Sequence, residues 1–76
     1  MFTVEIESNY SKLVSVDADN EFEDVEMYLE DNGTVFIRQF CEELNEYQLI
    51  TVNYAQILEL KAALDADEGV YITDIK

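Results

Sequence analysis

The chain has 76 residues, a length that supports one domain covering residues 1–76. Aspartate and glutamate number 18 against four lysines and arginines, which gives a net charge of −14. This acidity excludes direct binding to DNA, RNA or an anionic membrane surface, because those partners need a basic footprint. Apolar residues still make up 49% of the chain, so a folded domain with a core is expected instead of disorder.

The first strand signal is an alternation of apolar and polar residues at the N-terminus. Phe2, Val4 and Ile6 alternate with polar side chains, which is the period-two pattern of a strand with one solvated face. A second β-branched run covers 13–16, and the polar residues between the two runs supply a turn. We therefore predict a β-hairpin over residues 2–17.

The acidic segment 17–31 is compatible with two secondary structures. As a helix, it would place Phe22, Val25 and Leu29 on one stripe. As a strand, it would pair with 34–40, a run that is itself clearly a strand. We favour the strand, because the run 34–40 needs a partner nearby.

The dipeptide Asn32-Gly33 is a strong hairpin signal and also predicts a register. A two-residue turn there would place Leu29 opposite Phe36 and Val25 opposite Phe40. Both pairs are apolar and would be suitable for a core.

The C-terminal half contains a strand, a helix and a short final strand. The run 47–52 follows a polar bend at 42–46 and closes another hairpin. A helix follows over about 54–64, and residues 70–72 predict a short last strand. The fold class is therefore α+β, an antiparallel β-meander of four to five strands with one helix packed on the sheet.

The helix has a clear beginning and one apolar face. Asn53 is a favourable N-cap, and Gln56 three residues later completes a capping box. Ile57, Leu60 and Leu64 lie on one face of the predicted helix. We expect these three side chains to be buried against the sheet.

The passage from strand to helix resembles a known family. Ile50-Thr51-Val52-Asn53, followed by Gln56-Ile57-Leu58-Glu59-Leu60, is similar to the four-strands-then-helix unit of the transcriptional-coactivator single-stranded-DNA-binding proteins. The likeness covers residues 25–64 and implies the same order of elements. Members of that family contact DNA through basic and aromatic residues on the sheet, whereas the corresponding positions here are mostly acidic or apolar.

The sequence has few of the residues on which enzyme catalysis usually depends. The chain has no histidine, so neither a Ser-His nor a Cys-His pair can form. Cys41 is the only cysteine, and the acidic neighbours Glu42 and Glu43 disfavour its thiolate. We expect that the protein is not an enzyme, that it uses no cofactor, and that it works in the cytoplasm.

A calcium loop is matched only in part. Asp17, Asp19 and Glu21 occupy the first, third and fifth places of the template. Phe22 stands where the template requires glycine, and Tyr28 where it requires the bidentate glutamate. We therefore expect no dedicated metal site.

The most informative pattern is the row of carboxylates in the acidic segment 17–31. In an extended chain, alternate residues project to one side about 6.6 Å apart, a repeat comparable to that of nucleic-acid phosphates. Such a row could meet lysines and arginines arranged for phosphates. The other interpretation is a solvated loop that prevents sheet edges from pairing. The candidate partner-binding residues are Asp17, Asp19, Glu21, Glu23, Asp24, Glu26, Glu30 and Asp31, extended by Glu42, Glu43 and Glu46.

In size and acidity the chain resembles the small phage-encoded inhibitors that imitate DNA. That resemblance implies a basic nucleic-acid-binding protein of the host cell as the partner, and no direct contact with nucleic acid or membrane. An acidic adaptor that binds a protein through exposed aromatics such as Tyr10, Tyr47 or Tyr71 is the alternative. An exposed sheet edge would also suit pairing with a second copy as a homodimer.

Overall fold

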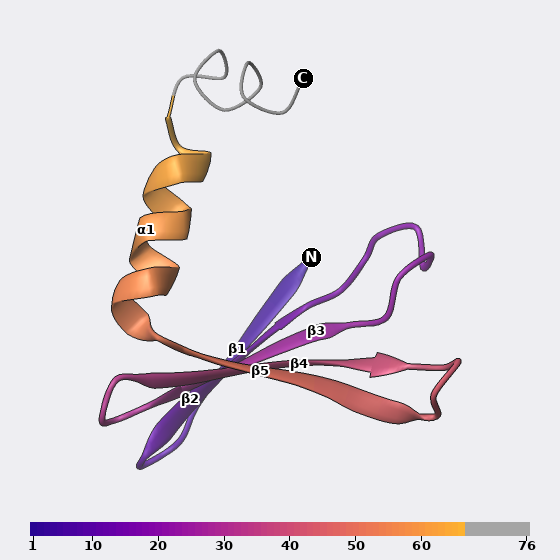
Figure 1. Cartoon of the computed structure of the whole chain (residues 1–76), viewed down its shortest axis with the longest axis horizontal. Helices are drawn as coiled ribbons and strands as arrows, with labels where there is room; N and C mark the ends of the chain where they lie inside the picture. Colours follow the sequence, from indigo (N-terminus) through magenta and orange to yellow (C-terminus); the bar gives the residue numbers. More distant parts are fainter. Residues whose placement is uncertain (67–76) are drawn as a thin grey trace.

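The computed structural model describes residues 1–66, which form a five-stranded antiparallel sheet followed by one helix. The strands follow one another across the sheet in chain order, as a simple meander (Figure 1). The elements are β1 (Phe2–Ile6), β2 (Tyr10–Ser15), β3 (Val25–Glu30), β4 (Thr34–Cys41), β5 (Glu46–Asn53) and α1 (Tyr54–Leu64). The predicted α+β meander is confirmed, and the predicted strand at 70–72 lies outside the described residues.

The first hairpin forms as its alternating pattern predicts. Phe2 pairs with Ser15 and Ile6 with Ser11, and the turn is closed by the bond from Glu7 N–H to the carbonyl of Tyr10 at 2.9 Å. The segment before β3 resolves the choice between helix and strand. Residues 25–30 are a strand, while 17–24 form a loop.

The register of the next hairpin differs by one residue from the predicted one. Leu29 lies opposite Val35 and Val25 opposite Gln39, not opposite Phe36 and Phe40. The connection is a three-residue loop in which Gly33 has φ of 88°, and Gly33 N–H donates to Glu30 C=O at 3.1 Å. A left-handed glycine after a tight turn is the usual form of such loops. The two-residue turn was therefore wrong.

The two faces of the sheet have different compositions, because directly opposite residues share a face. One face, which we call the apolar face, carries the row Val4, Leu13, Met27, Ile37 and Ile50 across all five strands. The other, which we call the charged face, carries Glu5, Lys12, Glu26, Glu30 and Arg38.

The helix begins at the predicted residue but does not cover the sheet. Asn53 accepts a hydrogen bond from Gln56 N–H at 2.8 Å, and the Gln56 side chain accepts one from Asn53 N–H at 3.0 Å. From this capping box the helix rises away from the end of β5 (Figure 1). Leu60 is 61% exposed and Leu64 is 73% exposed, so their expected burial is wrong. Ile57 is half-buried.

Burial is low throughout the described residues. Val35, near the start of β4 on the apolar face, is the one fully buried side chain among them. The helix packs on the sheet through its first turn, where Tyr54 N–H donates to the carbonyl of Gly33 at 2.8 Å. Tyr54, Leu29 and Val35 line a hollow at this junction.

Candidate functional site: an acidic end of the sheet

The loop that precedes β3 is organised by the first carboxylate of the acidic segment. The Asp17 side chain accepts hydrogen bonds from the backbone N–H groups of Glu21 at 2.9 Å and Phe22 at 3.0 Å. A third bond, from Asp19 N–H, measures 3.4 Å. These bonds lower the pKa of Asp17, because they stabilise its charged form. The N–H groups of Glu21 and Phe22 contribute most, and that of Asp19 contributes less. Asp17 is therefore a structural residue that closes its own loop.

The expected extended row of carboxylates does not form. Because residues 17–24 turn around the Asp17 side chain, their acidic side chains do not alternate along a straight strand. The 6.6 Å repeat of an extended chain therefore does not apply to this segment. Asp19, Glu21, Glu23 and Asp24 remain exposed on the loop.

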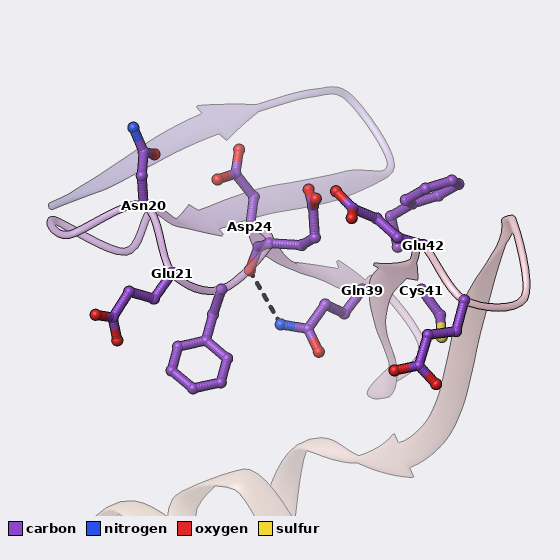
Figure 2. Close-up of a pocket in the computed structure, with 10 residues that line it drawn as sticks. Asn20, Glu21, Asp24, Gln39, Cys41 and Glu42 are labelled. Atoms are coloured by element: carbon purple, nitrogen blue, oxygen red, sulfur yellow. Dashed lines mark hydrogen bonds between the residues drawn. The ribbon is translucent and has the colours of Figure 1, made fainter.

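The fold brings this loop beside the turn between β4 and β5. Both lie at the same end of the sheet (Figure 1), because β3 begins where β4 ends. Gln39 in β4 holds them together by donating from Nε2 to the carbonyl of Glu23 at 3.0 Å. Figure 2 shows Asp24 and Glu42 on the two sides of the resulting hollow. We call the carboxylates around it the acidic end: Glu21, Glu23, Asp24, Glu42 and Glu43.

The ionisation of Glu23 is affected by its acidic neighbours. The pKa of Glu23 is raised, chiefly by a hydrogen bond with the Glu42 side chain and further by desolvation and by the charges of Glu42 and Asp24. Neighbouring carboxylates disfavour one another's ionisation, because like charges repel. The acidic end therefore holds its negative charges under mutual repulsion.

Glu26, the second residue of β3, has the opposite environment. On the charged face, Arg38 donates to it from Nε at 3.2 Å and from Nη2 at 3.1 Å. Lys12 Nζ lies 3.3 Å from the same carboxylate, and Tyr28 Oη donates to it at 2.9 Å. Desolvation opposes ionisation, but the bonds from Arg38, Tyr28 and Lys12 together lower the pKa of Glu26. Its side chain is only 12% exposed, so Glu26 is an internal ion-pair centre instead of a contact for a partner.

The remaining candidate residues lie elsewhere. Glu30 and Asp31 flank the β3–β4 turn at the opposite end of the sheet, which we call the far end together with the β1–β2 turn. Glu46 begins β5, opposite Cys41. The fold thus gathers five of the eleven predicted residues into one hollow.

Sequence reasoning missed the cation–aromatic cluster on the charged face. The Arg38 guanidinium lies 4.1 Å from the centroid of the Tyr47 ring and 5.6 Å from that of Tyr28. Tyr47 also packs edge-on against Phe40, with centroids 5.3 Å apart. These contacts follow from the register that sets Glu26 opposite Arg38. A predicted three-residue loop between β3 and β4 would have placed Glu26 opposite Arg38 and so revealed this ion pair.

The comparisons with known proteins identify a family without a function. A family model described as "Domain of unknown function (DUF8831)" matches residues 3–63, so the chain belongs to that family. No curated protein and no solved structure matches the chain. Among the helices described, none is long and apolar enough to cross a membrane. Within residues 1–66, acidic and cysteine side chains form no group of three that could hold a metal ion.

Proposed function

We propose that this domain is a protein-binding module whose acidic end occupies the basic groove of a nucleic-acid-handling protein. In this role it would act in the cytoplasm of the host cell as an inhibitor, as the small phage-encoded DNA mimics do. The observation that carries the proposal is the convergence of two separate acidic loops on one hollow.

Charge pairing inside the domain supports this assignment. The ion pairs formed within residues 1–66 join Lys12 and Arg38 to Glu26, and Lys61 to Asp65. None of them involves a carboxylate of the acidic end. Those carboxylates therefore keep their full attraction for lysines and arginines of a partner.

The electrostatics of the acidic end also suit a partner with a basic groove. Five clustered carboxylates on a chain of net charge −14 produce a strong negative potential. Such a potential accelerates encounter with a positively charged groove and weakens as salt screens it. Binding of the partner would further relieve the repulsion between Glu23 and Glu42.

A matched pair of charge-reversal variants tests the proposal. One variant carries Glu21→Lys, Glu23→Lys and Glu42→Lys at the acidic end. The control carries Glu7→Lys, Glu30→Lys and Asp31→Lys at the far end, so the change in net charge is the same. Each protein is immobilised, and proteins captured from host lysate are quantified at low and at physiological salt.

We expect the acidic-end variant to lose its specific partner by on the order of a hundredfold, because three attractive contacts become repulsive. The far-end variant should retain the partner, and capture by the wild type should decrease as salt rises. Equal capture by both variants would contradict the proposal. Binding through exposed aromatics, as in an adaptor, would then be the better account.

A further inference from the structure

The apolar face of the sheet has no cover within the described residues. Phe2, Ile6 and Ile50 point from this face and are 75%, 81% and 56% exposed. A sheet in a soluble domain normally buries one face against a second layer. The aliphatic, aromatic and methionine side chains on this face are Phe2, Val4, Ile6, Leu13, Val25, Met27, Leu29, Val35, Ile37, Ile50 and Val52.

The helix presents a second uncovered apolar surface. Ile57, Leu60 and Leu64 follow one another at helical spacing, and the last two are largely exposed. The helix starts beside Leu29 and Val35 of the apolar face, yet it rises away from the sheet (Figure 1). Within residues 1–66, both surfaces therefore lack the second layer that a core requires.

We propose that the second layer is another copy of this chain, which covers the apolar face and the helix stripe in a homodimer. One fully buried side chain within residues 1–66 is too small a core for a stable domain. The cover must then be present whenever the chain folds. A second copy meets this condition, because it is always available in equal amount.

The distribution of charge permits this contact between two strongly acidic chains. The strand carboxylates Glu5, Glu26 and Glu30 lie on the charged face, away from the proposed contact. Glu46 is the one strand carboxylate on the apolar face, and it lies at the end of β5. Two copies can therefore bury their apolar faces while most of their charges remain in water.

The available area approaches what a dimer needs. Five strands about 4.8 Å apart, with about six residues of ~3.3 Å each, make a face of roughly 480 Å² in flat projection. The helix stripe adds to this, and the accessible area of a corrugated face exceeds its projection. Stable interfaces bury about 800 Å² per partner, whereas monomers rarely expose apolar patches above a few hundred Å².

The mass and the thermal stability of the whole chain test the proposal. Light scattering during size exclusion should give twice the chain mass of 8.8 kDa at micromolar concentration. The melting temperature should rise with protein concentration, because dilution dissociates a dimer that folding requires. A mass of one chain together with a concentration-independent melting temperature would overturn the proposal.

Two adjacent residues of β5 locate the interface. Ile50 is on the apolar face and 56% exposed, whereas Leu49 is on the charged face and 62% exposed. Ile50→Lys should raise the dimer dissociation constant by about a hundredfold or more, since it buries a charge. Leu49→Lys should leave the dimer intact. Leu60→Ala, which removes apolar surface without adding charge, should weaken the dimer even if Ile50→Lys fails to fold.

Other outcomes exclude this geometry. A dimer that survives Ile50→Lys and Leu60→Ala is held by its sheet edges instead, and one that dissociates only with Leu49→Lys uses the charged face. The salt dependence of binding distinguishes this self-association from binding of the acidic end. Self-association of two acidic chains should strengthen with salt, while binding of the acidic end to a basic groove should weaken. Failure of one proposal is thus distinguishable from failure of the other.

Discussion

Glu23 and Glu26 belong to the same acidic segment, but their surroundings shift their pKa values in opposite directions. The raised pKa of Glu23 stabilises the fold below the pH at which free glutamate titrates, and this contribution is lost as the pH rises through the folded pKa. The lowered pKa of Glu26 contributes stability above that pH, and this contribution is lost as the pH falls. At neutral pH the ionised Glu26 therefore contributes to stability, whereas the contribution of Glu23 is lost.

Replacement of Glu26 by glutamine should destabilise the protein at neutral pH. The change removes the shared partner of Lys12 and Arg38, both of which reach water and can be resolvated. We expect a loss of about 1–2 kcal/mol in the free energy of unfolding at pH 7. At an acidic pH below the lowered pKa of Glu26 the difference should vanish, because Glu26 is then protonated in the wild type. Urea denaturation at the two pH values measures both.

Glu5→Gln is the matched control for this prediction. Glu5 is also a strand glutamate on the charged face, but it is exposed, and no pair joins it to a lysine or arginine among the residues described. Its replacement should change stability little at either pH. A loss for Glu26→Gln that persisted at this acidic pH would show that packing, not charge, explains the cluster.

Residue-level environments could be predicted only in part. The acidity and the exposed carboxylates of the 17–24 loop follow from composition. The ion pairing of Glu26 does not follow from the sequence. A register error of one residue changes which β4 side chains share its face, and Arg38 is then no longer opposite Glu26. Asp17 looked like a contact residue because sequence spacing does not reveal which backbone N–H groups a loop turns toward it.

At the scale of single elements, the β3–β4 turn depends on Gly33. Its φ of 88° lies in the left-handed region, and an added Cβ would meet no atom within 4 Å. Any cost of a side chain is therefore a backbone cost. We expect Gly33→Ala to lower the free energy of unfolding by about 1 kcal/mol. Gly33→Asn should cost less, because asparagine tolerates this conformation. Equal losses in urea denaturation would point to a packing effect instead.

The start of the helix depends on its capping box. Asn53→Ala removes the acceptor for Gln56 N–H and should cost about 1 kcal/mol. Circular dichroism should show reduced helix content, since the helix has little tertiary support beyond its first turn. Asn53→Asp keeps an acceptor at the same position and should retain the helix. Unchanged helix content in the alanine variant would contradict this role.

Local signals explain which elements were predictable. Alternation of apolar residues identified the strands, and Asn53 with Gln56 identified the first turn of the helix. Asn32-Gly33 marked the turn but could not distinguish a two-residue from a three-residue loop, because both accept a left-handed glycine. The exposure of Leu60 was not predictable, since an apolar stripe does not say which surface covers it.

At the scale of the whole molecule, the apolar face of the sheet and the acidic end are different parts of the surface. The apolar face is available to a second copy, while the acidic end projects beyond the sheet and is built from two loops. A dimer of this kind would present two acidic ends on one particle. Two contacts on one particle increase the apparent affinity for a partner with repeated grooves.

The most direct test of the central claim is competition between the domain and nucleic acid for the captured partner. Fluorescence anisotropy of a labelled duplex bound to that partner would be followed at constant ionic strength while the domain is added. The wild type and the far-end variant should release the duplex and lower the anisotropy, and the acidic-end variant should not. An anisotropy that stays high or rises while the wild-type domain is bound would show that the domain and the duplex occupy different sites, and would contradict the account.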